Sequence, residues 1–313
     1  MILRDWRDAD AAAVRDCYER ERQHWLAGLS WDTTWTWATV EQARVARGLP
    51  GFLAVDGSGQ ARGWAFFVLD EGTLHIGGLV ADSDAVTRLL LDGIVFGSEL
   101  RRAAAAACFV LDRARGLAVA LADHGFVVEP FHYLSSSLDS RGLRVSDVEG
   151  QPQDQPFASW HDGDVGDTAA LLEASYSEEA GRHFAADGNW ERYVTGLVDQ
   201  AGCGVFDTSL TALVRDEAGL QGAALVTCVS PSTAHLAQLV VRPECRGRGL
   251  ASRLTRDAAA RAAAAGKTEL TLLVGEQNQI ARHLYAAMGF TTKATFLAAR
   301  REGRGAARYV AAS

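Results

Sequence analysis

The stretch Val240-Val-Arg-Pro-Glu-Cys-Arg-Gly-Arg-Gly-Leu-Ala-Ser-Arg-Leu254 links an apolar run to an alanine- and arginine-rich run through a short polar turn. The apolar run 234–241 predicts a strand, and Pro243 ends it because proline cannot donate a hydrogen bond to a strand ladder. The run 250–265 has the composition of a helix. The sequence therefore predicts a strand, a tight glycine-containing turn and a helix in direct succession.

The turn itself is suited to bind an anion. Gly247 and Gly249 allow the backbone to approach a ligand closely and to adopt dihedral angles that other residues avoid. The N–H groups at the start of the helix point outward, and the helix dipole places partial positive charge there. Arg246 and Arg248 add full charges, so the turn can hold a pyrophosphate. An arginine-rich surface turn that caps an ordinary helix is the alternative.

The two halves of the chain share a weak but ordered repeat. The pattern His-x-x-x-Leu-Val occurs at 75–80 and at 235–240. A Gly-Phe pair follows a helix-like run at 125–126 and again at 289–290, where glycine is expected to cap the helix. Each half also carries an earlier hairpin with turn residues between its strands. The repeat indicates two copies of one α/β unit.

Two segments together resemble the GNAT N-acetyltransferase superfamily. The coenzyme A loop of that family reads Gln/Arg-x-x-Gly-x-Gly/Ala, and Arg246, Gly249 and Ala251 fit it in register. The run Asn278-Gln-Ile-Ala-Arg-His-Leu-Tyr-Ala-Ala-Met-Gly-Phe290 is similar to the downstream motif Asn-x-x-Ala-x-x-x-Tyr-x-x-x-Gly-Phe. The match covers residues 205–298 well and the rest of the C-terminal half loosely.

The resemblance implies an α/β (α+β) fold with two tandem GNAT-like domains, each a mixed, mostly antiparallel, splayed sheet flanked by helices. Residues 1–140 would form a degenerate GNAT-like domain that does not bind coenzyme A. The polar, aperiodic segment 141–156 would be a linker, and residues 157–313 would form the catalytic domain.

The resemblance also implies an activity, the transfer of acetyl from acetyl-CoA to a primary amine by direct attack, without a covalent enzyme intermediate and without a metal. Tyr285 falls on the family's tyrosine position and would protonate the departing thiolate; a core tyrosine is the alternative. The oxyanion would be held by a backbone N–H of the preceding strand. The residues implied to bind the acyl donor are Leu239, Val240, Val241, Arg246, Gly247, Arg248, Gly249, Leu250, Ala251, Asn278 and Arg282.

His235 is the candidate base that would take the proton of the amine. It occupies the position of a catalytic glutamate in histone-acetyltransferase-like members, and strand alternation would place it on one face with Leu239 and Val241. Water is the alternative base. His75 has the equivalent position in the first half, which lacks the coenzyme A loop motif and the tyrosine. The shared histidine can therefore also be a packing feature.

The first half lacks the chemistry of the second. The loop after Val80 is short and carries Asp82 and Asp84, which would repel a pyrophosphate, and Leu121 takes the tyrosine position. Tryptophans are frequent in this half, and they indicate either an aromatic pocket or an ordinary core. In the second half, acidic and aromatic residues at 173–192 could hold a cationic amine or form a solvated helix face.

Composition limits the partners. The formal net charge of −8 disfavours a nucleic-acid binder. The five cysteines lack the spacing of a disulfide framework or a zinc site, which fits a reducing cytoplasm. No apolar run is long enough for a membrane helix. The expected acceptor is a small-molecule or peptide amine, and the chain is expected to be a monomer or a homodimer. A longer acyl-CoA or acyl-carrier-protein donor, or a non-catalytic CoA-binding module, remains as an alternative function.

Overall fold

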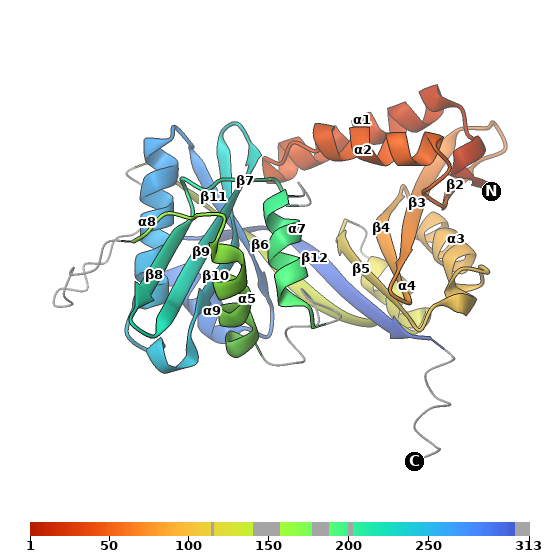
Figure 1. Cartoon of the computed structure of the whole chain (residues 1–313). Coiled ribbons are helices and arrows are strands. Elements are labelled where there is room, and N and C mark those ends of the chain that lie inside the picture. The colour runs from red at the N-terminus through yellow and green to blue at the C-terminus, as the bar shows by residue number, and fades with distance from the viewer. Residues whose placement is uncertain (114–115, 140–156, 177–187, 200–202, 304–313) are drawn as a thin grey trace, which may run out of the picture. The chain divides into compact units, whose positions relative to one another are not determined.

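The computed structural model describes residues 1–113, 116–139, 157–176, 188–199 and 203–303 (Figure 1). The chain forms two compact units. Unit 1 comprises Met1–Leu29, Thr33–His132 and Ala294–Ser313, and unit 2 comprises Ser30–Asp32 and Tyr133–Lys293. The predicted linker, residues 141–156, lies outside the described residues.

The sheet of unit 1 has the strand order β1-β2-β3-β4-β5-β12. Its strands are β1 (Ile2–Asp5), β2 (Gly51–Val55), β3 (Ala61–Asp70), β4 (Thr73–Ala81), β5 (Ala105–Leu111) and β12 (Thr291–Glu302). Its helices are η1 (Trp6–Asp8), α1 (Ala11–Leu29), α2 (Thr34–Val45), α3 (Asp84–Val95), η2 (Leu100–Arg102) and α4 (Leu117–Asp123).

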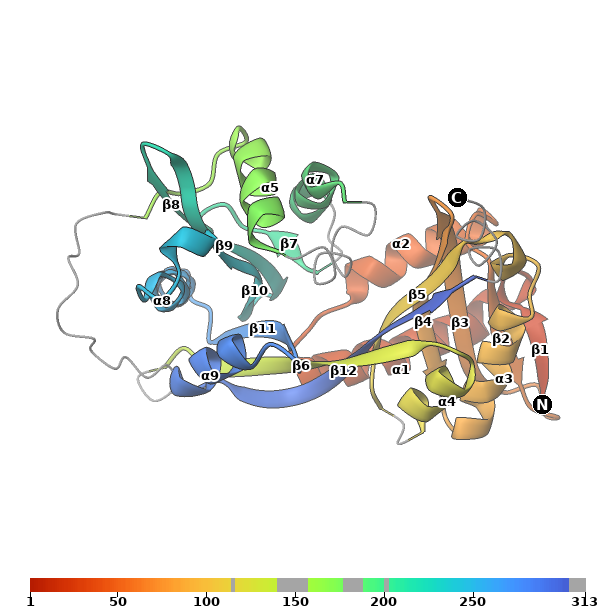
Figure 2. The same cartoon turned by 90° about the horizontal axis from the view of Figure 1, so that it is seen from below.

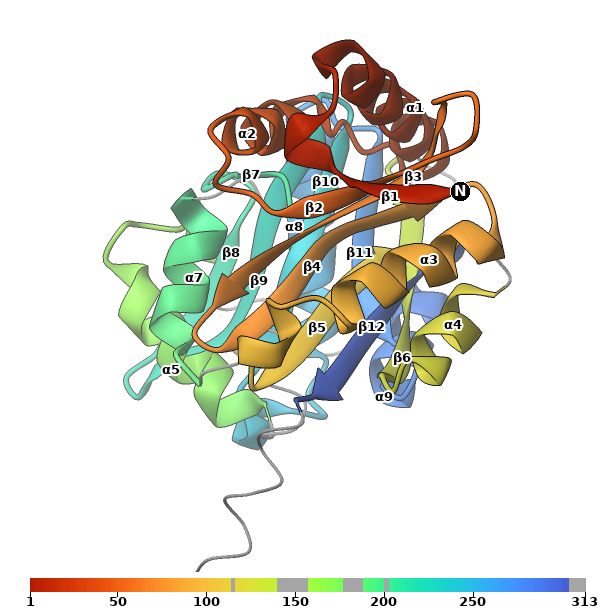
Figure 3. The ribbon, with the colours of Figure 1, turned by 90° about the vertical axis from the view of Figure 1, so that its right-hand side faces the viewer.

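Apolar clusters fill both faces of this sheet. Helix α3 covers one face (Figure 3). It contributes the fully buried Leu90, Leu91 and Ile94, as expected of an amphipathic helix. On the other face α1 packs on the aromatic side chains of Trp6, Trp64 and their neighbours.

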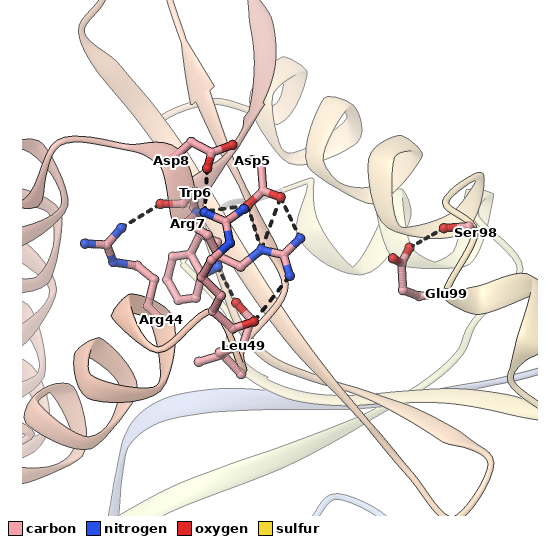
Figure 4. Close-up of polar contacts among 9 residues, drawn as sticks. Asp5, Trp6, Arg7, Asp8, Arg44, Leu49, Ser98 and Glu99 are labelled. Carbon is pink, nitrogen blue, oxygen red and sulfur yellow. Dashed lines mark hydrogen bonds and ion pairs between the residues drawn. The ribbon is translucent and has the colours of Figure 1, made fainter.

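Trp6 is tied to the surrounding chain by its polar atoms (Figure 4). Its indole Nε1 donates to the carbonyl oxygen of Leu49 at 2.8 Å, and its own carbonyl oxygen accepts from Arg44 at 2.7 Å. The buried indole and the buried guanidinium thus both have partners, as buried polar groups require.

Unit 2 has the strand order β6-β11-β10-β9-β7, and β8 also pairs with β9. Its strands are β6 (Val127–Ser137), β7 (Val205–Phe206), β8 (Ala212–Asp216), β9 (Gly219–Ser230), β10 (Thr233–Val241) and β11 (Glu269–Gly275). Its helices are α5 (Asp164–Ser175), α7 (Trp190–Asp199), η3 (Pro243–Cys245), α8 (Leu250–Ala264) and α9 (Gln279–Ala287).

Helices α8 and α9 lie on one side of the unit 2 sheet and α5 and α7 on the other (Figure 2), and a different apolar cluster fills each side. The α8 and α9 side includes Leu254 and Met288. The α5 and α7 side includes Leu172 and Val194. A residue of β10 can therefore be assigned to a face by the cluster to which it contributes.

The internal repeat is confirmed at the two Gly-Phe positions. Gly125 and Gly289 both have the left-handed conformation, with φ of +83° and +92°. The N–H of Phe126 donates to the carbonyl of Leu121, and the N–H of Phe290 donates to that of Tyr285. These bonds form the same C-terminal cap on α4 and on α9. Leu121 and Tyr285 thus occupy equivalent positions, as the sequence predicted.

Each unit has a parallel strand pair that separates partway. The β4–β5 ladder runs from Thr73 with Ala105 to Ile76 with Cys108, although both strands continue further. The β10–β11 ladder likewise covers only the residues up to Leu236 and Leu272. Among the described residues, the strand pairs β1–β2, β2–β3, β3–β4, β5–β12, β7–β9, β8–β9 and β9–β10 are antiparallel. The predicted mixed, mostly antiparallel, splayed sheets flanked by helices are therefore confirmed.

The closing strands do not follow the halves of the sequence. Strand β12 follows α9 of unit 2, yet its residues Phe296–Glu302 pair with β5 of unit 1. Strand β6 follows α4 of unit 1, and in the order of strands it lies between β12 and β11. The division into units thus differs from the predicted ranges 1–140 and 157–313 at these strands. Among the described helices, none combines the length and apolar character needed to span a bilayer.

Candidate functional site

The candidate site lies in unit 2, where β10 continues beyond its ladder with β11. Leu239, Val240 and Val241 keep their antiparallel pairing with β9, opposite Ala224, Ala223 and Gly222. Their ladder to β11 has already ended at Leu236. One edge of β10 is therefore released from the sheet over the residues predicted to bind the acyl donor.

The predicted anion-binding turn follows directly. Gly247 and Gly249 have φ of +74° and +73°, a region that side chains other than glycine rarely adopt. Helix α8 begins at Leu250, and its N-cap Gly249 offers no side-chain hydrogen bond. No acidic residue lies in the first turn. The first N–H groups of α8, including that of Ala251, are thus left for an external acceptor.

The two arginines of the turn have different surroundings. Arg246 Nε donates to the carbonyl of Val241 at 3.1 Å, and its NH2 donates to the carbonyl of Ser175 at 2.8 Å. Its guanidinium therefore joins the end of β10 to the end of α5. Arg248 is exposed, and its charge faces solvent beside the free helix start. The sequence did not separate these two roles.

Tyr285 is a buried residue of α9, with 6% of its surface exposed. Its ring contacts Phe290 edge-on, with centroids 5.6 Å apart. Burial raises the pKa of the phenol, and Tyr176 adds to this effect. The hydroxyl therefore stays protonated at neutral pH, which is the state that a proton donor needs.

Asn278 and Arg282 lie at the start of α9. Asn278 is the N-cap residue, and its Oδ1 accepts from the N–H of Ala281 at 3.1 Å. Arg282 donates to the carbonyl of Glu276 at 3.3 Å. Both side chains thus have structural contacts, so either could contact a ligand only through its remaining N–H groups.

The expected common face of His235, Leu239 and Val241 is wrong. A β-bulge between Leu236 and Gln238 adds one residue to β10 and reverses the alternation. Leu236, Leu239 and Val241 contribute to the cluster under α8 and α9. His235 precedes Leu236 and points to the opposite face.

His235 is enclosed on that face. Only 2% of its surface is exposed, and its Nδ1 lies 2.9 Å from Thr271 Oγ1. The rings of Trp31 and Tyr133 lie against it, with centroids at 5.4 and 5.8 Å. Burial lowers the pKa of the imidazole to about 4, so the ring is neutral at pH 7.

A buried polar network on β10 escaped the sequence analysis. Tyr176 donates to Gln238 Oε1 at 2.9 Å, and Gln238 Nε2 donates to Tyr193 at 2.6 Å. Trp190 stacks on Tyr176 at 5.3 Å. Burial raises the pKa of Tyr176 to about 12, partly opposed by Arg246. Gln238 faces α5 and α7, opposite Leu239 and Val241, as strand alternation over 238–241 requires, but no local pattern in the sequence indicates its two tyrosine partners.

The acceptor side predicted at 173–192 is described only in part. Tyr176 and Trp190 belong to the network above. The remaining candidate residues of this segment that lie outside the described residues are Glu178, Glu179, His183, Phe184 and Asp187.

Unit 1 lacks the uncapped helix start and the tyrosine of unit 2 at the equivalent positions. Ser83 caps α3, and its Oγ accepts from the N–H of Val86 at 3.4 Å. Asp84 lies in the first turn of α3. The start of α3 therefore carries its own cap and a negative charge, and Leu121 has no hydroxyl to donate.

Comparisons with known proteins agree with this geometry. The sequence pattern of the Acetyltransferase (GNAT) family matches residues 154–290. No curated protein matches the chain.

Several solved structures share the fold at low sequence identity. A GCN5-related N-acetyltransferase from Sphaerobacter thermophilus superimposes with a TM-score of 0.57 at 18% identity, covering 80% of each chain. A tandem GNAT protein from the clavulanic acid biosynthesis pathway gives 0.55 at 18% identity, covering 81% of this chain and 82% of its own. A GNAT-family acetyltransferase from Colwellia psychrerythraea gives 0.56 at 13% identity, covering 96% and 100%. Residues 154–290 thus match the Acetyltransferase (GNAT) family, and the chain has a fold similar to that of a solved tandem GNAT protein.

Proposed function

We propose that the chain transfers an acetyl group from acetyl-CoA to the primary amine of a small molecule or peptide, in a ternary complex at unit 2. The GNAT fold supports an acyl-transfer function in general. The acetyl donor, the amine acceptor and the direct mechanism belong to the proposal.

One structural observation gives the main support for this proposal. The released edge of β10 leads, through two glycines with positive φ, into a helix start without a side-chain cap. Backbone N–H groups in this arrangement fit a pyrophosphate, and Arg248 supplies a matching charge. The ladder between β10 and β11 ends before Leu239–Val241, so the extended arm of the same donor can form hydrogen bonds with this free edge of β10.

The chemistry then needs three groups. The amine nitrogen attacks the thioester carbonyl carbon, and the carbonyl oxygen gains negative charge. A backbone N–H of Leu239 or Val241 is our candidate donor to this oxygen. As the carbon–sulfur bond breaks, Tyr285 donates its proton to the leaving sulfur. The raised pKa of Tyr285 keeps that proton available throughout the neutral range.

We propose that water, rather than His235, is the base that accepts the proton of the amine. A base with a pKa of about 4 is poorly matched to an ammonium group, because catalysis favours a pKa near the working pH. His235 is also enclosed by Thr271 and two aromatic rings. Its contacts support a packing role on β10.

Calorimetric titration with acetyl-CoA tests the proposal, with Arg248→Ala as the variant. This variant is preferred to a change at Arg246, whose side chain also joins β10 to α5. We expect one site per chain and weaker binding in Arg248→Ala. Two sites would show that unit 1 also binds the donor. No binding of acetyl-CoA would favour a longer acyl donor or an acyl-carrier protein. Binding without turnover over a panel of amines would favour a CoA-binding module.

A further inference from the structure

Unit 1 contains a pocket of about 90 Å³ where β4 and β5 diverge. Its lining includes the strand segments 77–81 and 109–111 together with the indoles of Trp25, Trp37 and Trp64. Every lining residue belongs to unit 1. The acyl-transfer proposal for unit 2 makes no use of this pocket.

The adjacent helix start disfavours a phosphate-bearing ligand. The cap on α3 is supplied by Ser83, and Asp84 places negative charge in its first turn. A phosphate there would meet an occupied N–H group and a carboxylate. A ligand of this pocket must therefore be held by other contacts.

Aromatic rings that pack on one another form the walls of the pocket. Trp37 stacks on Tyr18 with centroids 5.0 Å apart, and it meets Trp64 edge-on at 5.2 Å. Phe109 lines the pocket with 43% of its surface exposed, although it stacks on Phe296 at 5.2 Å. Flat apolar surfaces of this kind fit a planar apolar ligand, because stacked and edge-on contacts both need little reorganisation.

One ion pair supplies the charge. Both oxygens of Glu21 accept hydrogen bonds: Oε1 accepts from Trp25 Nε1 at 2.5 Å and from Arg113 Nη2 at 2.7 Å, and Oε2 accepts from Arg113 Nη1 at 2.5 Å. The Glu21 side chain is 5% exposed, whereas that of Arg113 is 25% exposed. The guanidinium has five N–H donors, and Glu21 takes two of them. Of the two charged groups of this pair, the positive one is therefore the more accessible.

We propose that this pocket of unit 1 binds a small planar carboxylate, such as an aromatic acid, with its carboxylate on Arg113 and its ring against the aromatic walls. The aromatic lining selects the planar body, and the unequal exposure of Arg113 and Glu21 selects the anionic head. The site is separate from acyl transfer, and its occupation requires no acyl donor.

The test is calorimetric titration of the full chain, without coenzyme A, using benzoate and the matched cation benzylamine. We expect benzoate to bind at one site and benzylamine not to bind. Glu21→Gln/Arg113→Met removes both charges and leaves an acceptor for the indole N–H of Trp25. It should weaken benzoate binding about tenfold or more, the range of a charge-assisted hydrogen bond. Arg88→Met/Asp123→Asn removes an exposed ion pair of unit 1 and should leave benzoate binding unchanged.

Several results would overturn this proposal. Binding of benzylamine in place of benzoate would show that the pocket is a cation site. Equal binding of benzoate to both double variants would place it elsewhere, and no binding of either probe would leave the pocket as a packing gap. Competition by saturating acetyl-CoA would identify a second donor site. Failure of acetyl transfer in unit 2 would change none of these titrations, so the two proposals fail separately.

Discussion

Replacing Tyr285 with phenylalanine is the sharpest test of the proposed chemistry. The substitution removes one hydroxyl and keeps the ring, which is 6% exposed and contacts Phe290. Among the described residues, none forms a hydrogen bond with this hydroxyl, so its loss leaves no partner there unsatisfied. We therefore expect the free energy of unfolding to change by less than about 1 kcal/mol.

The expected effect on turnover is much larger. A positioned general acid contributes about 10²- to 10⁴-fold to a reaction rate. Each factor of ten corresponds to about 1.4 kcal/mol, so the barrier should rise by about 3–5 kcal/mol. Because burial raises the pKa of Tyr285, the wild-type protein should also show no alkaline loss of kcat from this group below about pH 10.

The assay follows release of free thiol from acetyl-CoA in the presence of an amine that the wild-type protein accepts. Affinity for coenzyme A, measured by calorimetry, should stay within about twofold, because the phenol acts only on the leaving sulfur. The matched control is Tyr18→Phe, a buried tyrosine of unit 1 that should leave kcat unchanged. A kcat within twofold of the wild type in Tyr285→Phe would show that this residue is not the acid.

Three further expectations follow from unit 2. Arg248→Ala should weaken acetyl-CoA binding about 3- to 30-fold with an unchanged Tm, since the side chain is exposed. Arg246→Ala should also lower the free energy of unfolding, by about 1–2 kcal/mol, because it removes the bonds to the carbonyls of Val241 and Ser175; an unchanged Tm would argue against this bracing role. Burial lowers the pKa of His235, so between about pH 6.5 and 4 its imidazole is protonated in the unfolded chain but stays neutral in the folded chain. The free energy of unfolding should therefore be largest above pH 6.5 and decrease as the pH falls below it. Urea unfolding across this range should show a smaller loss in His235→Asn, and the same variant should keep the pH profile of kcat/KM, which a catalytic base would not allow.

Local chemistry in the sequence was enough to place the turn and the helix ends. Glycines at 247 and 249 were expected to adopt special dihedrals, and both have positive φ. The caps at Gly125 and Gly289 followed from the position of glycine after a helical run. These features depend on neighbouring residues, so a single sequence contains the needed information.

Features that depend on long-range pairing were not accessible in this way. The bulge before Gln238 is set by the pairing of β10 with β9, and it reversed the predicted face of His235. The partners of Gln238 lie 62 and 45 residues away in the chain. Polar networks of this kind arise from packing of helices on a sheet, and no periodicity in the sequence shows which side chains will meet.

Strand β12 follows α9 of unit 2 but pairs with β5 of unit 1, and this gives a physical reason why the chain retains unit 1 although that unit lacks the donor-binding turn. Helix α9, which carries Tyr285, ends at a cap on Gly289, and β12 begins two residues later at Thr291. The far part of β12 then forms seven residue pairs with β5, from Phe296 to Glu302. Strand β12 lies between β5 and β6 in the order of strands, so loss of unit 1 would remove this ladder and expose one edge of the strand that follows the helix of the proposed acid. The chemistry of unit 2 can therefore depend on unit 1 through one continuous strand, even though unit 1 has leucine where unit 2 has tyrosine.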